Sequence, residues 1–108
     1  MRVLLDSCVP QRLRDSLAAH DVQSARFAGL EGLLDRELLD ALEGIFDVMV
    51  TCDRSIPWQQ SMQGRRVGVL VLVAPSNRLA DLLPLVPALL NVLAEIRPGE
   101  LREVALES

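Results

Sequence analysis

The feature that most constrains the fold is a short apolar run that stops at polar residues. Val48–Val50 is apolar and rich in β-branched side chains, and Thr51–Asp53 follows it at once. A run of this kind is typical of a strand buried on both faces of a parallel sheet. The N-terminus repeats the pattern, because Asp6 directly follows the apolar run of Arg2–Leu5. Ligands of open α/β sheets bind at the carboxyl ends of strands, so both aspartates are candidate site residues.

Length and composition predict one globular domain over residues 1–108. The chain is half apolar, which is enough to form a core. Its first residues are strand-like and do not resemble a signal peptide. The most apolar stretch, Leu82–Leu90, is too short to span a bilayer. We therefore expect a soluble, cytoplasmic protein with no membrane contact, and free thiols at Cys8 and Cys52.

The charge balance limits the classes of partner. The formal net charge is −4, all basic residues are arginine, and aromatic residues are scarce. A nucleic-acid partner would therefore depend on local arginines and bridging metal ions. A broad base-stacking platform is not expected.

Strand-like and helix-like patterns alternate along the chain, which predicts a three-layer α/β/α fold. The first strand, its helix and the second strand should form a right-handed crossover. We expect a mostly parallel sheet with strand order 2-1-3-4, in which a last strand could run antiparallel at one edge. The predicted elements are a strand at 2–5, a helix after Pro10 with a buried stripe of Leu13, Leu17 and Ala18, a strand at 22–25, a helix from Asp35 to Gly44, a strand at 48–51, a short helix or turn from Ser55 to about Met62, a strand at 67–73, helices from an Asn77 N-cap to about Glu95 with a break near Leu83, and a strand at 101–106.

The predicted strand order places an acidic cluster at one edge of the sheet. Asp6 and Asp53 would lie side by side, and Asp35 could approach from the entrance of its helix. Carboxylates that converge repel one another unless a cation joins them, and hard oxygen ligands suit Mg²⁺ or Mn²⁺. Such a site can hold a phosphodiester and activate water. Asp35 is also a good N-cap, and the two roles do not exclude each other.

These motifs resemble the short PIN-like proteins of bacteria and archaea, relatives of the VapC-type toxin nucleases of toxin–antitoxin pairs. The family pattern opens with a strand ending in Asp-Glu-Asn-Leu-Pro, continues with a loop ending in Asp before a Leu-rich helix, and adds a strand ending in Thr-Arg-Asp-x-Asp-Phe. The resemblance runs over nearly the whole chain. The matching segments here are Asp6–Pro10, Gly32–Leu39, Thr51–Ile56 and a final strand at Gly68–Leu72.

The resemblance implies a metal-dependent ribonuclease with an antitoxin partner. The acids that match are Asp6, Asp35 and Asp53, with Glu37 as a substitute ligand, and Thr51 would orient Asp53 or a bound water. Three positions depart from the family, because Ser7, Cys8 and Ser55 replace its Glu, Asn and second Asp. The loss of an acid lowers the expected metal affinity. A catalytically silent PIN-like module that binds partners therefore remains the alternative.

Several residues keep two interpretations. Arg54, Arg65 and Arg66 could bind RNA phosphates or simply face solvent. Cys8 and Cys52 could form a zinc or redox pair, although two thiols without further ligands make a poor zinc site. A phospho-acceptor receiver domain also places acids after strands one and three, but it would be expected to need a lysine that this chain lacks.

The helical region 77–96 predicts a protein partner. Its apolar residues are too many for one buried stripe, so part of them should form an exposed patch. We expect a homodimer through this region, with an antitoxin-like protein able to bind as well. Breaks at Pro84 and Pro87 could instead let short helices each bury their own face.

Overall fold

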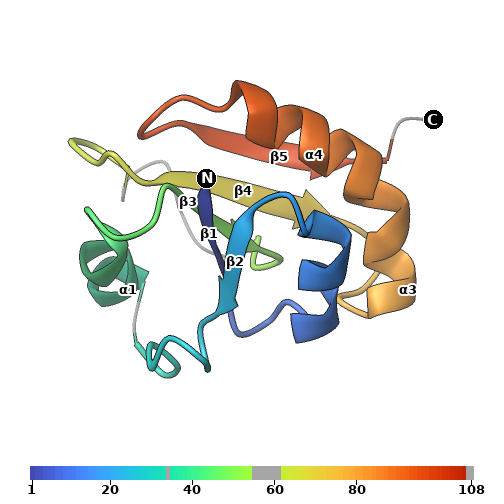
Figure 1. Cartoon of the computed structure of the whole chain (residues 1–108), viewed down its shortest axis with the longest axis horizontal. Helices are drawn as coiled ribbons and strands as arrows, with labels where there is room; N and C mark the ends of the chain where they lie inside the picture. The colour runs from blue at the N-terminus through green and yellow to red at the C-terminus, as the bar shows by residue number, and fades with distance from the viewer. Residues whose placement is uncertain (34, 55–61, 107–108) are drawn as a thin grey trace.

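The structure is a computed structural model that describes residues 1–33, 35–54 and 62–106, with Asp35 described by its backbone alone. The helix or turn predicted from Ser55 to about Met62 lies almost wholly outside the described residues. The elements are β1 (Arg2–Leu5), η1 (Gln11–Leu17), β2 (Asp21–Ser24), α1 (Asp35–Leu42), β3 (Val48–Thr51), β4 (Gly68–Val73), α3 (Leu79–Leu82), η2 (Leu83–Leu85), α4 (Val86–Glu95) and β5 (Leu101–Ala105) (Figure 1).

The described strands form a five-stranded sheet of order β2-β1-β3-β4-β5, and every neighbouring pair is parallel. The α/β class and the order 2-1-3-4 are therefore confirmed. The antiparallel option for the last strand is wrong, because Val69 pairs with Leu101 and Val73 pairs with Ala105 in parallel register. The physical reason is the connection, since α3, η2 and α4 carry the chain back along the sheet before β5 begins.

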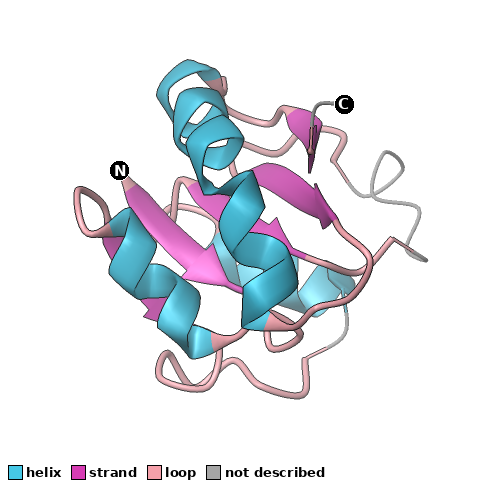
Figure 2. Ribbon diagram, turned by 90° about the vertical axis from the view of Figure 1, so that its right-hand side faces the viewer, coloured by secondary structure: helices cyan, strands magenta, loops and turns pink. Residues whose placement is uncertain are grey.

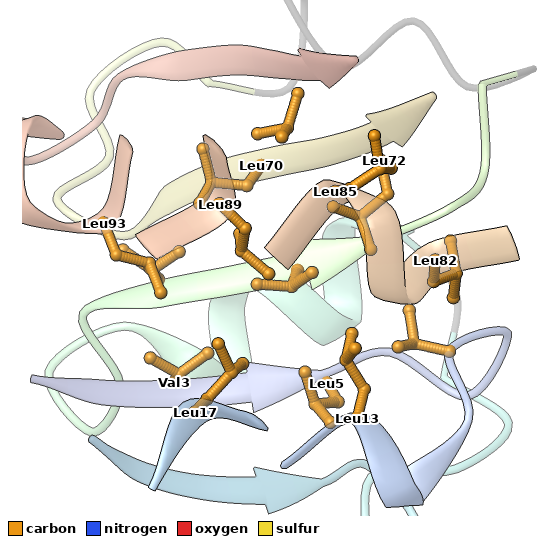
Figure 3. Packing of buried hydrophobic residues seen from close by; sticks show 14 residues of the cluster. Val3, Leu5, Leu13, Leu17, Leu70, Leu72, Leu82, Leu85, Leu89 and Leu93 are labelled. Carbon is orange, nitrogen blue, oxygen red and sulfur yellow. The ribbon is translucent and has the colours of Figure 1, made fainter. Parts of the chain in front are cut away.

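Alternate residues of each strand supply two cores, one on each face of the sheet. One face carries Val3, Leu5, Val50 and Leu70 and packs against leucines of η1, α3, η2 and α4 (Figure 3). The other face carries Leu4, Met49, Val69 and Val71 and packs against α1 through Leu38, Leu39 and Leu42. Helices thus lie on both sides of the sheet (Figure 2). The period of two along the strands explains why a continuous apolar run is needed in each.

The connection from β4 to β5 has an unusual handedness. The connection from β1 to β2 and the connection from β4 to β5 step in opposite directions across the sheet, yet both cover the face of Val3 and Leu5. Their hands must therefore be opposite. The first is right-handed, as predicted, and the second is left-handed, against the usual rule for parallel strands (Figure 3). Burial explains the exception. Figure 3 shows Leu85 and Leu89 beside Leu72 and Leu70 of β4, whereas the leucines of η1 lie beside Val3 and Leu5 of β1.

Local details of the helices differ from the predictions. Leu13 and Leu17 are buried in η1, but Ala18 is exposed, because η1 is a 3₁₀ helix that ends at Leu17. The predicted break near Leu83 is confirmed, since α3 ends at Leu82 and a 3₁₀ turn precedes α4. Asn77 is not the N-cap, since Arg78 holds that position and makes no side-chain capping bond. Within the described segments, every helix is too short or too polar to cross a bilayer.

Candidate functional site

The site lies where the chain changes direction across the sheet. After β1 the chain adds β2 on one side of β1, and after β3 it adds β4 on the opposite side of the sheet. The switch point, where the strand order reverses, therefore lies between β1 and β3. Crevices outside the carboxyl ends of such strands are where open α/β sheets bind ligands. Asp6 directly follows β1, and Thr51 ends β3 with Asp53 two residues later. The fold therefore brings these three predicted residues to one edge.

A single hydroxyl group connects the two aspartates. Thr51 is fully buried, and its hydroxyl donates to Asp6 Oδ2 at 2.8 Å. The Thr51 hydroxyl oxygen also accepts a hydrogen bond from the backbone N–H of Asp53 at 3.1 Å. Asp6 is further held by its own N–H, which donates to the Val50 carbonyl at 2.9 Å. The network fixes the Asp6 carboxylate and the Asp53 backbone relative to each other.

Two cysteines lie in the same network. The Cys8 sulfur lies 3.4 Å from Thr51 Oγ1 and donates to Asp6 Oδ2 at 3.7 Å. It also accepts the backbone N–H of Cys52 at 3.3 Å. Both thiols are free and half-buried. Cys8 thus contacts both Asp6 and Thr51 in the network.

These contacts shift the titration of the thiols in opposite directions. The pKa of Cys8 is lowered to about 6, chiefly because the Cys52 thiol donates to its sulfur, with help from Thr51 and from the Cys52 backbone N–H. Burial and the negative charge of Asp6 oppose this lowering. The pKa of Cys52 is raised far above its ordinary value, because its proton is held in the hydrogen bond to Cys8 and because the group is buried.

An open cleft of about 320 Å³ adjoins the network. Asp53 and Arg54 line it, whereas Asp6 is not among the described residues of its wall. The remaining described lining residues are Cys8, Cys52, Leu72, Ala74, Ser76 and Asn77. The cleft therefore presents one carboxylate, one guanidinium and two thiols to solvent.

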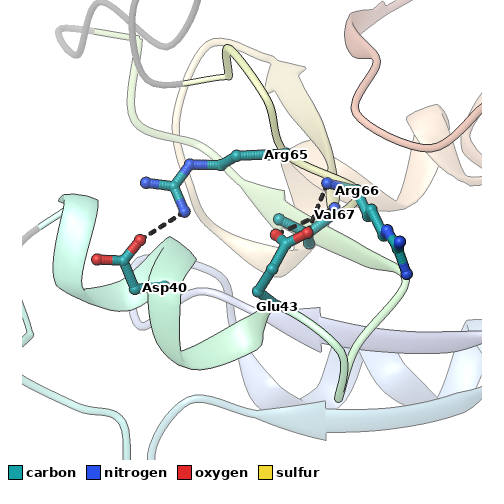
Figure 4. Close-up of polar contacts among 5 residues, drawn as sticks. All are labelled: Asp40, Glu43, Arg65, Arg66 and Val67. Atoms are coloured by element: carbon teal, nitrogen blue, oxygen red, sulfur yellow. Dashed lines mark hydrogen bonds and ion pairs between the residues drawn. The ribbon is translucent and has the colours of Figure 1, made fainter.

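Other predicted site residues lie elsewhere or outside the description. Arg65 and Arg66 precede β4, so they lie near the amino edge of the sheet, opposite the cleft. There Arg65 pairs with Asp40 at 2.7 Å, and the Arg66 N–H donates to Glu43 at 2.6 Å (Figure 4). Their role in RNA binding stays a prediction.

The second acidic motif is described only in part. Glu37 is an exposed residue of α1. Asp35 begins α1, and both its predicted capping role and its predicted metal-facing role depend on a side chain outside the described residues. The departure at Ser55 also lies outside them. The contribution of this motif to the cleft therefore stays a prediction.

The carboxylates at the cleft suit a metal site completed by water and substrate better than a site formed by protein ligands alone. Among the described residues, no group of three or more His, Cys, Asp and Glu side chains could hold a metal ion. Asp6 and Asp53 nevertheless supply two carboxylates, and Asp6 Oδ1 accepts the N–H of Ser7 while retaining further lone pairs. Mg²⁺ is usually bound by one or two carboxylates, with water and substrate phosphate as the other ligands. Two carboxylates match that number, and the described residues form no all-protein cage.

Sequence reasoning missed the contribution of the segment after β4. Asn77 Nδ2 donates to the Cys8 carbonyl oxygen at 3.2 Å, which ties this segment to the loop after β1. Ser76 Oγ donates to Asp81 and accepts the Arg78 N–H at 3.1 Å. The signal was available, because Ser76 and Asn77 follow a strand end just as Asp6 and Asp53 do.

Comparisons with known proteins add no family to this description. No protein-family model, no curated protein and no solved structure matches the chain. The class that fold and site define is an α/β domain with an all-parallel sheet of order 2-1-3-4-5 and a polar cleft at its switch point.

Proposed function

We propose that this chain is a PIN-like, metal-dependent endoribonuclease of the toxin type. Asp6 and Asp53 would hold Mg²⁺ or Mn²⁺ at the switch-point cleft, and an RNA phosphodiester would be the substrate. The observation that carries the proposal is the Thr51 hydroxyl, which links the Asp6 carboxylate to the Asp53 backbone across two adjacent strands. A buried hydroxyl in this position holds the Asp6 carboxylate close to the Asp53 backbone at the sheet edge.

Each residue at the cleft would have a different role in RNA cleavage. A bound divalent cation would supply charge that stabilises the developing negative charge on phosphate and lowers the pKa of an attacking water. Asp53 lines the cleft and would carry the ligand nearest to substrate. Arg54, exposed at the same cleft, would contact an RNA phosphate. Thr51 acts through the two aspartates and is a positioning residue.

The remaining predicted groups enter the proposal with separate roles. Asp35 or Glu37 would complete the ligand set from α1. Arg65 and Arg66 would contact RNA only if it extended to the amino edge of the sheet. The Arg65 contact would also have to compete with its ion pair to Asp40, which is short at 2.7 Å.

Cleavage of a fluorescent single-stranded RNA tests the proposal. We expect activity with Mn²⁺ or Mg²⁺ that is lost with EDTA and lost in Asp53→Asn, which keeps shape and removes charge. Asp40→Asn is the matched control, because it removes the same charge from α1, where Asp40 pairs with Arg65. Activity that survives EDTA and Asp53→Asn, or that falls equally in Asp40→Asn, would contradict the assignment.

A silent PIN-like module is the second candidate. Two observations favour it: thiols lie beside Asp6, and the described residues offer fewer than three grouped metal ligands. Absence of cleavage with any divalent metal, in protein whose fold is intact by circular dichroism, would favour this module over the nuclease. The same module would then act by binding an antitoxin-like partner.

The proposal includes a homodimer, but its contact surface is smaller than the whole helical region 77–96. Within the region 77–96, Leu89 and Leu93 are each 1% exposed, whereas Leu83 and Leu90 are 43% and 36% exposed. The helices thus bury most of their leucines, as short pieces separated at the break, and leave a small outward patch. We expect Leu83→Glu with Leu90→Glu to convert a homodimer into monomer in sedimentation. A wild type that sediments as monomer at tens of micromolar, a range suited to modest interfaces, would remove the dimer.

A further inference from the structure

We propose that Cys8 and Cys52 are a modification site, which a low-molecular-weight disulfide such as oxidised glutathione converts into an intramolecular disulfide bond. This inference goes beyond the proposed nuclease and does not depend on it. It rests on where the fold places two thiols, on their access to the cleft and on the absence, among the described residues, of a group of three or more metal ligands around them.

The first observation is the contact between the two residues. Cys8 lies three residues after β1 and Cys52 lies directly after β3, so the parallel pairing of these strands brings the two together. The backbone N–H of Cys52 donates to the sulfur of Cys8 at 3.3 Å. A disulfide requires that the two cysteines approach closely, and this hydrogen bond places the Cys52 backbone beside the Cys8 sulfur.

The second observation is that the contact is held from several sides. Asp6 is bonded to Val50 through its N–H and to Thr51 through its carboxylate, and its carbonyl oxygen accepts the N–H of Val9 at 2.9 Å. From the other side, Asn77 donates to the carbonyl of Cys8 at 3.2 Å. The loop after β1 is thereby fixed against the end of β3, so the Cys8 sulfur stays beside the Cys52 backbone.

The third observation is that small molecules can reach both thiols from solvent. Both cysteines line the open cleft together with Ser76 and Asn77. A small reagent can therefore reach a thiol without unfolding of the sheet. Zinc is a poor competitor for the pair, because the described residues offer no group of three or more suitable ligands.

The reaction balances as two thiol–disulfide exchanges. In the first, one cysteine sulfur attacks oxidised glutathione, which forms a protein–glutathione disulfide and releases one reduced glutathione with the proton of that thiol. In the second, the sulfur of the other cysteine attacks the protein sulfur, which forms the Cys8–Cys52 bond and releases a second reduced glutathione. The protein loses two hydrogen atoms, and one oxidised glutathione becomes two reduced molecules.

Intact-mass spectrometry of the native full chain tests the inference. After treatment with oxidised glutathione, we expect a monomer that has lost two hydrogen atoms and carries no glutathione, with Cys8 and Cys52 joined in the peptide map. The variants Cys8→Ser and Cys52→Ser should each stop at a single glutathione adduct. Asn77→Ala, which frees the loop after β1, should accumulate more of the mixed disulfide than wild type.

Three results would overturn the inference. They are wild-type protein with both thiols unmodified, wild-type protein with two glutathione adducts, and a disulfide-linked dimer in place of the monomer. Because RNA cleavage is not part of the readout, failure here leaves the nuclease proposal intact. Loss of cleavage in Asp53→Asn likewise leaves the disulfide untouched.

Discussion

Replacement of Thr51 by Val removes the group that connects the two aspartates and keeps the side-chain shape. Thr51 is fully buried, so the exchange leaves almost no cavity. It deletes a 2.8 Å hydrogen bond to a carboxylate, and bonds to charged groups contribute about 1.5–3 kcal/mol. The Asp53 N–H also loses its acceptor, but cleft water can replace it because Asp53 is half-exposed. We expect the free energy of unfolding to fall by about 2 kcal/mol.

A double-mutant cycle in urea isolates this bond. Thr51→Val and Asp6→Ala each remove one side of it, so the two losses should not add, and the coupling should reach about 1.5 kcal/mol or more. Thr51→Ser is the control, because it keeps the hydroxyl and loses only a methyl group. If the two losses add to within about 0.5 kcal/mol, as they do for independent sites, the connecting role of Thr51 is refuted.

Three further predictions concern stability. Gly99 and Gly44 both have positive φ, at 76° and 80°, but an added Cβ would overlap the Arg65 carbonyl oxygen only at Gly99. Gly44→Ala should therefore cost about 1–2 kcal/mol and Gly99→Ala clearly more in urea unfolding, and equal losses would contradict the close contact. The folded-state pKa of Cys8 is lowered to about 6, whereas an unfolded thiol titrates near about 8.5. Between these values the unfolded chain binds more protons, so stability should rise with pH, and a Cys8→Ser variant with the same slope would refute this. A Cys8–Cys52 bond would close a loop between residues 44 positions apart, so the oxidised protein should gain about 4 kcal/mol in the chain-entropy limit, and thermal unfolding of both forms measures the gain.

The strands and their order were accessible from the sequence because each is a short apolar run between polar residues. Val48–Thr51 and Gly68–Val73 are buried along nearly their whole length, as their composition predicted. Asp6, Thr51 and Asp53 followed from the rule that strand ends meet at one edge of a parallel sheet. That rule needs only strand boundaries and order, both of which leave local traces in a sequence.

Features that depend on long-range packing could not be predicted from the sequence. The direction of β5 depends on how far α3, η2 and α4 return the chain, and the left-handed hand of that connection depends on which face lacks cover. The sequence gives helix-like patterns for this region but not the face on which they pack. Asn77 was misassigned for a related reason, because its partner is the carbonyl of Cys8, which is distant in the chain.

The candidate site shows the same limit. Residue types placed two acids at one edge, but only the structure shows that the cleft wall includes Cys8, Cys52 and Asp53 and not Asp6. Likewise, Arg65 and Arg54 look equivalent as arginines. The structure separates them, since one pairs with Asp40 and the other lines the cleft.

The central claim is that Asp6 and Asp53 share one divalent cation. Crystals of the full chain soaked in Mn²⁺ test it most directly through the anomalous scattering of the metal. The account predicts an anomalous peak at the switch-point cleft within coordination distance of carboxylate oxygens from both residues, and loss of that peak in Asp53→Asn. An Mn²⁺ peak that appears only elsewhere on the protein, or one at the cleft that persists unchanged in Asp53→Asn, would contradict it.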